Sequence, residues 1–260
     1  MTYPQIDSVI IELGPFAVRW YGLMYLLGFV FAYFIIGHLA RCRKLELSST
    51  LLSDLLFYGV LGVVVGGRLG YTLFYNSAYY LAHPLEIFAI WEGGMSFHGG
   101  LLGVVVCVLY FCRRNQLPAL TVGDMLVTAA PVGLGLGRLG NFINGELWGR
   151  VTTVSWGMVF PGGGPDPRHP SQLYEAVCEG PVLFVLLYGL FRLKLPPGVV
   201  FSAFFVGYGT IRFVLEFFRQ PDAHLGLLWA GATMGQLLSV PMIIFGLIGL
   251  IYFQRKGFAA

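Results

Sequence analysis

The stretch VRWYGLMYLLGFVFAYFIIGHLA (Val18–Ala40) leads directly into the basic segment RCRK (Arg41–Lys44). A helix that crosses a lipid bilayer needs about 20 mainly apolar residues, and this stretch supplies them. The whole chain is similar: 57% of its 260 residues are hydrophobic, 11% are charged, and the mean hydropathy is +0.74. Soluble domains carry about 25% charged residues. The composition therefore indicates a membrane protein and excludes a disordered chain, a nucleic-acid-binding protein and an ordinary cytosolic enzyme.

Apolar stretches of spanning length recur along the chain. We expect transmembrane helices at about 18–39, 52–74, 97–112, 121–140, 174–191, 198–217 and 235–254. The first is a retained span, because no basic region and short apolar core of a cleaved signal peptide precede it. Glycine supplies 36 residues, about twice the usual share of about 7%, which suits closely packed membrane helices. The fold class that we predict is all-α: a polytopic integral membrane protein with about seven spans and one domain, 1–260.

Basic residues predict the orientation, because cytoplasmic loops of membrane proteins are enriched in lysine and arginine. Nine basic residues follow spans 1, 3, 5 and 7, against four on the other side of the membrane. This places the N-terminus outside and the C-terminus in the cytoplasm. The loop 141–173, which contains PGGGPDPRHP, then forms a small extracytoplasmic cap.

Cysteine and histidine give no sign of a metal or disulfide site. Four cysteines lack any framework spacing, and five histidines lack a ligand pair such as HExxH. We expect no metal and no cofactor.

Three arginines lie within or at the edge of apolar stretches: Arg68, Arg138 and Arg212. Each is roughly 20–26 Å from the cytoplasmic start of its span at about 1.5 Å per residue. A single arginine would be read as snorkelling to the headgroups, but three at similar depth form a cationic cluster that suits a phosphate. The tetrapeptide GRLG surrounds both Arg68 and Arg138, through an old duplication or through chance.

Span 6 places polar groups on one helix face. Tyr208, Arg212 and Glu216 follow one another at intervals of four in GYGTIRFVLEFFRQPD, and Arg219 comes three residues later. This face must look into the protein or into a wet cavity. Arg212 and Glu216 form either part of a site or a purely structural pair.

Spans 3 and 4 add further candidates near the same level. His98 opens span 3 in FHGGLLG and is either a proton acceptor or a structural helix-start residue. GLGLGRLGNFINGELWGR (Gly133–Arg150) formally contains GxGxxG, but no strand precedes it, so a dinucleotide site is rejected. We interpret Gly133 and Gly137 as packing residues that bring Arg138 and the polar residues after it to the interface.

Taken from the residues alone, these groups indicate a site for an anionic lipid or another phosphate-bearing substrate in the outer half of the membrane. The string GRLGNFINGELWGR (Gly137–Arg150) also resembles the signature of the prolipoprotein diacylglyceryl transferase family. RWYGLMY, HGGLLG, RHPSQLYEA and the pattern from Tyr208 to Asp222 resemble the family in the same order. The resemblance covers essentially the whole chain.

The resemblance implies a bacterial cytoplasmic (inner) membrane enzyme with its active site toward the extracytoplasmic leaflet. Its reaction moves the sn-1,2-diacylglyceryl group of phosphatidylglycerol to the lipobox cysteine thiol in a prolipoprotein signal peptide. The products are a thioether and glycerol phosphate, in the first step of lipoprotein maturation. The substrate supplies the nucleophilic thiol, so no cysteine of the enzyme needs to react. Both substrates arrive within the bilayer, which requires a lateral opening.

The candidate site residues follow from the motifs and the chemistry together. We assign Arg138 and Arg212 to the phosphate and His98 to the thiol proton. The residues that would bind the headgroup or orient these groups are Tyr21, Asn141, Glu146, Gly149, Tyr208 and Glu216. The alternative function is an anion or lipid transporter with an outer-leaflet arginine site. A third possibility is a structural scaffold.

Overall fold

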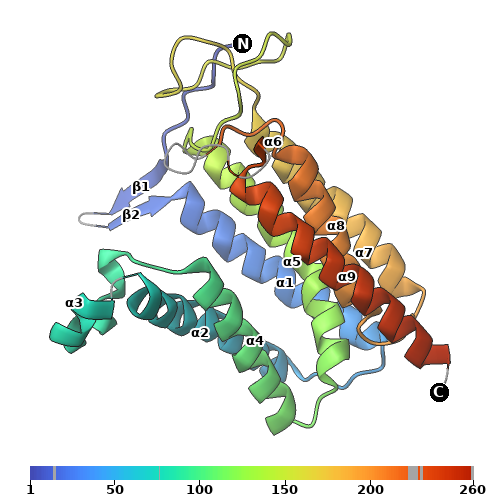
Figure 1. Ribbon diagram of the computed structural model, residues 1–260. Helices are drawn as coiled ribbons and strands as arrows, with labels where there is room; N and C mark the ends of the chain where they lie inside the picture. Colours follow the sequence, from blue (N-terminus) through green and yellow to red (C-terminus); the bar gives the residue numbers. More distant parts are fainter. Residues whose placement is uncertain (14–15, 76, 222–227, 229–230, 259–260) are drawn as a thin grey trace. The chain divides into compact units, whose positions relative to one another are not determined.

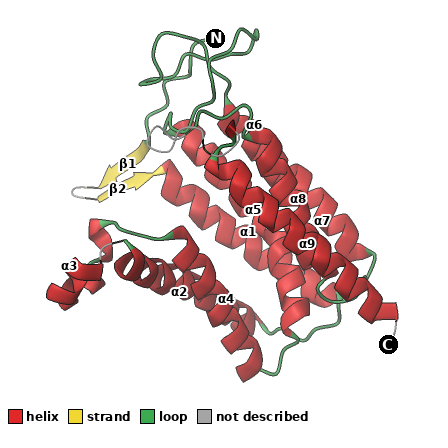
Figure 2. Cartoon of the chain, viewed as in Figure 1, coloured by secondary structure: helices red, strands yellow, loops and turns green. Residues whose placement is uncertain are grey.

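The structure is a computed structural model of the 260-residue chain, and it describes all residues except 14–15, 76, 222–227, 229–230 and 259–260. Almost all regular structure in the described part is helical (Figure 2). Six described helical segments are long and apolar enough to cross a membrane, and Val199–Leu215 is a shorter apolar helix. These segments match the seven predicted spans, so the prediction of a polytopic helical membrane protein is confirmed.

Figure 1 shows the long helices, and their ends lie within about four residues of the predicted spans. Their bounds are α1 Trp20–Cys42, α2 Ser49–Phe74, α4 Phe97–Arg114, α5 Ala119–Ile143, α8 Val199–Leu215 and α9 Met234–Phe258. The fifth span consists of α6 (Ser171–Val177), a π-helical turn η3 (Cys178–Val182) and α7 (Leu183–Arg192). Gly180 has non-helical angles there and Pro181 follows it, because proline removes a backbone donor and pushes the preceding residue out of the α region.

Short elements were missing from the sequence prediction. Strands β1 (Val9–Leu13) and β2 (Phe16–Arg19) pair antiparallel directly before α1. After α2 come the short helix α3 (Ser77–Ala82) and two 3₁₀ turns, η1 (Pro84–Phe88) and η2 (Ile90–Glu92). Each is at most six residues long, too short for a hydrophobic period to identify it.

Contacts group the chain into two compact units, which we describe separately. The larger unit comprises residues 1–43 and 123–260, and the smaller unit comprises residues 44–122. The expectation of one domain over 1–260 stays a prediction.

Glycines build the helix pair of the smaller unit. A Cβ atom on Gly62 would lie 2.7 Å from the carbonyl carbon of Gly103, and one on Gly70 would lie 2.7 Å from Cα of Gly99. Gly66 faces both Gly99 and Gly103. With glycines four residues apart on α2 and α4, the two backbones approach more closely than any side chain would allow.

Arg68 holds the loop that follows α2 instead of offering a free cation. Its side chain is buried at 4% exposure. Nε donates to the carbonyl of Ile87 at 2.8 Å, and Nη2 donates to that of Glu86 at 2.6 Å. Nη1 donates to Gly93 at 2.5 Å and Gly94 at 3.3 Å. The arginine thus binds the turns between α3 and α4 through their backbone.

We expect Arg68→Lys to loosen this loop, because one ammonium group cannot replace a guanidinium that serves four carbonyls. Hydrogen bonds from a charged group contribute about 1.5–3 kcal/mol each, so amide exchange over residues 86–94 should accelerate about 10- to 100-fold. Hydrogen–deuterium exchange of the purified protein measures this. Unchanged exchange in the loop would show that Arg68 does not hold it.

In the larger unit, α5 is fixed to the start of α8. The carboxylate of Asp124 accepts hydrogen bonds from the backbone N–H groups of Phe201 at 2.7 Å and Gly198 at 3.0 Å. Two of the unpaired donors at the N-terminus of α8 are thereby satisfied. Asp124 is 1% exposed.

The packing glycine of α5 differs from the prediction. A Cβ atom on Gly135 would lie 2.9 Å from Cα of Gly180 in η3, whereas one on Gly137 would meet nothing within 4 Å among the described atoms. The same holds for Gly133, although a Cβ on Gly28 of α1 would lie 3.3 Å from the Cα of Gly133. The interpretation as packing residues is therefore wrong for Gly137, whereas Gly133 does lie against Gly28 of α1. The closest glycine approach of α5 is made by Gly135 at the kinked fifth span.

The segment 141–173 is mostly loop (Figure 2) and has a small apolar core of its own. Tyr3, Phe142 and Phe160 are buried together, and the hydroxyl of Tyr3 donates to the carbonyl of Phe142 at 2.6 Å. The N-terminal amino group donates to the carbonyl of Gly157 at 2.6 Å. The first residues of the chain are thus part of this segment's structure.

Candidate active site

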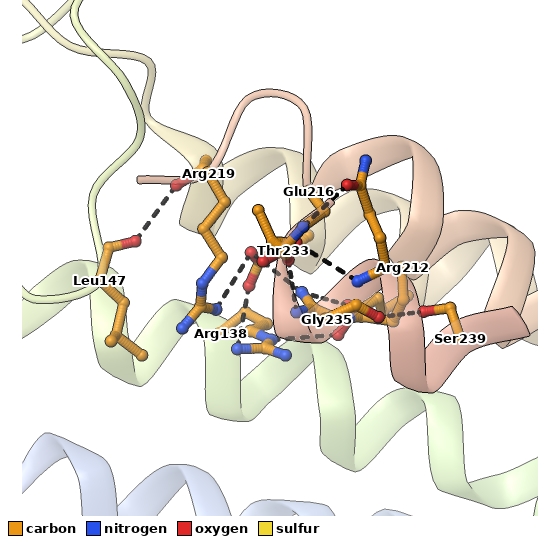
Figure 3. Close-up of polar contacts among 12 residues, drawn as sticks. Arg138, Leu147, Arg212, Glu216, Arg219, Thr233, Gly235 and Ser239 are labelled. Atoms are coloured by element: carbon orange, nitrogen blue, oxygen red, sulfur yellow. Dashed lines mark hydrogen bonds and ion pairs between the residues drawn. The ribbon is translucent and has the colours of Figure 1, made fainter. Parts of the chain in front are cut away.

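Arginines and glutamates from α5, the fifth span and α8 converge in one place. We call Arg138, Arg212, Arg219, Glu175, Glu179 and Glu216 the ion cluster. The shorter contacts are Arg138 Nη1–Glu175 Oε2 at 2.9 Å, Arg138 Nε–Glu179 Oε2 at 3.0 Å and Arg212 Nη2–Glu216 Oε2 at 2.9 Å. The longer ones run from Arg212 Nη1 to Glu175 at 3.2 Å and Glu179 at 3.4 Å, and from Arg219 Nη1 to Glu175 at 3.5 Å. Figure 3 shows Arg138, Arg212, Arg219 and Glu216 gathered in this region.

The arginine and glutamate side chains of the ion cluster differ in their solvent exposure. The side chains of Glu175 and Glu179 are 1% and 0% exposed, whereas those of Arg138 and Arg212 are 18% and 14% exposed. An approaching anion therefore meets guanidinium groups, and the carboxylates lie behind them. Removing one partner of such a buried pair is costly, because it leaves an uncompensated charge.

Local sequence explains how these groups meet. Glu175 and Glu179 are four residues apart across α6 and η3, so both lie on the same side of the fifth span. The contact between Gly135 and Gly180 then brings α5 close enough for Arg138 to reach both carboxylates. At the end of α8, Arg212 pairs with Glu216, the residue that follows the helix, at the same interval of four residues.

Sequence reasoning missed Glu175 and Glu179. Both lie in YEAVCEGPV, at the start of an otherwise apolar span. Acidic residues inside a membrane segment are expensive and mark functional positions by default, so the pair four residues apart was a usable signal.

The residues after Arg138 form a second polar group. Oε1 of Glu146 accepts hydrogen bonds from Nδ2 of Asn141 at 2.9 Å and of Asn144 at 3.2 Å. Nε2 of Gln172 donates to the backbone carbonyl of Glu146 at 2.7 Å. Asn141 is buried. The structure therefore brings two of the predicted binding residues, Asn141 and Glu146, into direct contact.

Tyr21 and Tyr208 border the two groups. The ring of Tyr21 lies against Gly140: a Cβ atom on Gly140 would be 3.0 Å from Cδ2 of Tyr21. The hydroxyl of Tyr21 is 3.1 Å from that of Tyr25. Electrostatic interactions connect Tyr21 to Arg138 and Glu146. Tyr208 stacks on Phe204 and interacts electrostatically with Glu179, Arg212 and Arg138.

Gly149 lies where no side chain fits. A Cβ atom there would be 2.5 Å from the carbonyl oxygen of Phe218 and 2.6 Å from that of His169. The N–H of Gly149 donates to the carbonyl of His169 at 2.9 Å, and the N–H of Arg150 donates to that of Phe218 at 2.9 Å. Gly149 therefore joins segment 141–173 to the end of α8, near Arg219.

We expect Gly149→Ala to shift this junction and to lower both the thermal stability and the activity of the protein, since overpacking costs about 1–3 kcal/mol of folding stability. Activity and thermal unfolding of the purified variant measure the effect. Gly189→Ala on α7 is the matched control, because a Cβ atom there meets nothing within 4 Å in the described part of the chain. Equal activity of both variants would contradict the assignment.

His98 belongs to the smaller unit, at the first turn of α4. Its imidazole is exposed and its ring lies 5.7 Å from that of Phe97. Ser96 caps the helix by accepting a hydrogen bond from the N–H of Gly99 at 3.2 Å. Its proposed role as the thiol base stays a prediction. The guanidinium of Arg68, the third arginine of the predicted cluster, binds the loop carbonyls within the smaller unit. Its membership of the cluster stays a prediction.

Two further predictions concern Asp222 and metal binding. Asp222, the last residue of the pattern that begins at Tyr208, lies outside the described residues. Within the described residues, no group of three or more histidine, cysteine, aspartate or glutamate side chains could hold a metal ion.

Together, the fold and the site define a polytopic membrane protein with an arginine–glutamate cluster that is mostly shielded from its surroundings. Comparison with known sequences identifies the group to which it belongs. The chain is a member of the prolipoprotein diacylglyceryl transferase family, which it matches over residues 8–252. The resemblance of its motifs to this family is thereby confirmed.

Relatives of nearly the same length carry the name phosphatidylglycerol–prolipoprotein diacylglyceryl transferase. The protein from Geobacter sulfurreducens is 57% identical over 256 residues, which cover 98% of each chain. The protein from Photobacterium profundum is 54% identical over 252 residues, or 97% of this chain and 95% of the relative. That from Aliivibrio fischeri strain MJ11 is 54% identical over 260 residues, or 100% of this chain and 92% of the relative.

Proposed function

We propose that this protein transfers the sn-1,2-diacylglyceryl group of phosphatidylglycerol to the thiol of a prolipoprotein cysteine. The observation that carries the proposal is the convergence of Arg138 and Arg212 on one ion cluster in a chain whose relatives bear the name of this enzyme. The protein is thus a transferase in lipoprotein biosynthesis and not an anion or lipid transporter.

The chemistry requires a cationic clamp. The sulfur forms a C–S bond with the glycerol carbon that carries the phosphate, the C–O bond breaks, and glycerol phosphate leaves with the additional negative charge. Fixed donors placed where this charge develops stabilise the transition state. Arg138 and Arg212 supply charged donors that are partly exposed, whereas the carboxylates that orient them are buried.

The remaining candidates hold the headgroup or the clamp. Tyr21, Asn141 and Glu146 would bind the free glycerol hydroxyls, since amide, carboxylate and phenol groups supply both donors and acceptors. Tyr208 and Glu216 would orient Arg212, whose Nη2 is 2.9 Å from Glu216 Oε2. Gly149 would position segment 141–173 over the site.

The location follows from the predicted topology. The enzyme works in the bacterial cytoplasmic membrane with its N-terminus outside, its C-terminus in the cytoplasm and its site toward the extracytoplasmic leaflet. Its protein substrate is a signal peptide whose lipobox cysteine reaches the site within the bilayer. Segment 141–173 is then an extracytoplasmic cap.

His98 is the candidate that removes the thiol proton, because the thiolate and not the thiol is the nucleophile. We expect His98→Gln to reduce the transfer rate at least about tenfold across pH 6–8, since general base catalysis typically contributes about 10²- to 10⁴-fold. Rates of the purified variant with phosphatidylglycerol and a lipobox peptide measure this. A near-normal rate across that range would exclude the base role.

One experiment separates the transferase from the other functions. The purified protein is incubated with phosphatidylglycerol and a lipobox peptide, and the peptide is analysed by mass. A mass increase of one diacylglyceryl group, absent when the peptide cysteine is serine, supports the transferase. Unmodified peptide together with phosphate-dependent flux in vesicles would instead establish a transporter.

A further inference from the structure

The charges of the ion cluster balance before any lipid is bound. Three guanidinium groups and three carboxylates are joined by contacts of 2.9–3.5 Å. A phosphodiester brings one more negative charge to this neutral group. In a region of low dielectric constant, an extra charge without a partner is strongly unfavourable. Binding of the lipid therefore requires a compensating change within the cluster.

The three glutamates differ in the favourable electrostatic partners that they keep once a phosphate binds Arg138 and Arg212. Glu175 also pairs with Arg219, at 3.5 Å. Glu216 lies at the start of α9, where a Cβ atom on Gly235 would be 2.7 Å from its Oε2; the N-terminus of a helix favours a negative charge. Among the described residues, the arginines that pair with Glu179 are Arg138 and Arg212 alone.

Glu179 is also the carboxylate that is least able to be solvated. Its side chain is 0% exposed. The groups that face it are Arg138 from α5, Arg212 and Tyr208 from α8, and Glu175 from its own span. Cys178 precedes it and interacts with it electrostatically. When the phosphate takes over both arginines, an ionised Glu179 would be left beside Glu175 without a cation of its own.

We propose that phosphatidylglycerol binds together with one proton, which Glu179 takes up as its arginines turn to the phosphate. This inference rests on the proposed function, since it assumes that the cluster binds the lipid phosphate. The total charge of the site then stays at zero in both states. Lipid binding should weaken up to about tenfold for each unit of rising pH wherever Glu179 is ionised in the free protein.

Isothermal titration calorimetry counts this proton directly. Short-chain phosphatidylglycerol is titrated into the purified protein at one pH in several buffers that differ in their enthalpy of ionisation. The slope of the measured binding enthalpy against the buffer enthalpy gives the number of protons taken up per lipid. We expect a slope of about one for the unaltered protein.

The variant Glu179→Gln tests whether Glu179 is the group that takes up the proton, because the amide is a neutral isostere of the protonated carboxyl group. This variant should bind the lipid with a slope of about zero and an affinity that no longer depends on pH. Asp166→Asn is the matched control, since Asp166 is exposed and lies outside the cluster; its slope should stay at about one.

The outcomes separate this inference from the function on which it rests. Absence of lipid binding in the unaltered protein would contradict the proposed function itself. Binding with a slope of zero would leave the function standing and overturn the coupled proton. A slope of about one that persists in a folded Glu179→Gln variant would assign the proton to another group and overturn the role of Glu179.

Discussion

Arg212→Lys is expected to lower the rate of diacylglyceryl transfer about 10²- to 10³-fold. In the structure the guanidinium of Arg212 spans Glu175, Glu179 and Glu216 with two nitrogen atoms. Lysine carries a single compact ammonium group without the planar fork that such bridging needs. Loss of one fixed donor for a developing negative charge typically costs about 2.7–4 kcal/mol, which corresponds to the expected reduction.

Initial rates at saturating phosphatidylglycerol and lipobox peptide measure this loss. Arg113→Lys is the control for the same chemical change, because Arg113 is exposed at the end of α4, and it should keep the original rate. If Arg212→Lys also kept it, Arg212 would be only a structural partner of Glu216.

Gly103→Ala should have the largest effect on stability. The added Cβ atom would lie 2.9 Å from Cα of Gly66 and would also collide with the carbonyl of Gly62. Both neighbours are backbone, so α2 and α4 would have to separate. Overpacking of this kind costs about 1–3 kcal/mol or more. We expect the midpoint of thermal unfolding to fall by about 5–10 °C.

Gly59→Ala offers a matched comparison on the same helix pair. A Cβ atom on Gly59 meets nothing within 4 Å in the described part of the chain. Alanine is favoured over glycine inside a helix by about 0.5–1 kcal/mol, so this variant should unfold at an equal or higher temperature. If both variants unfolded at the same temperature, the glycine contacts would not hold α2 against α4.

Hydropathy predicted most of this fold because each span must be apolar over its whole length. The first span illustrates this: the prediction of 18–39 corresponds to α1 at Trp20–Cys42. The hairpin of β1 and β2 was missed because its strands have five and four residues, and short apolar runs carry no distinctive period. The kink at Gly180 was also missed, although Pro181 in the predicted span was a signal for it.

The site was predictable only in part. Arg138, Arg212 and Glu216 stand out in the sequence because each is a charge near an apolar stretch, and the structure brings them together. Glu175 and Glu179 were overlooked because their stretch was interpreted only as an apolar span and, at RHPSQLYEA, as a family motif. The role of Arg68 could not be predicted, because depth in the membrane does not reveal which carbonyls an arginine can reach.

The most direct test of the central claim is the binding of phosphatidylglycerol itself, measured without a peptide so that no transfer occurs. Native mass spectrometry of the purified protein counts the lipid that stays bound. We expect the unaltered protein to retain phosphatidylglycerol, and a folded variant with both Arg138→Gln and Arg212→Gln to lose it. Equal retention by the two proteins would contradict the account, because the lipid phosphate would then be held elsewhere.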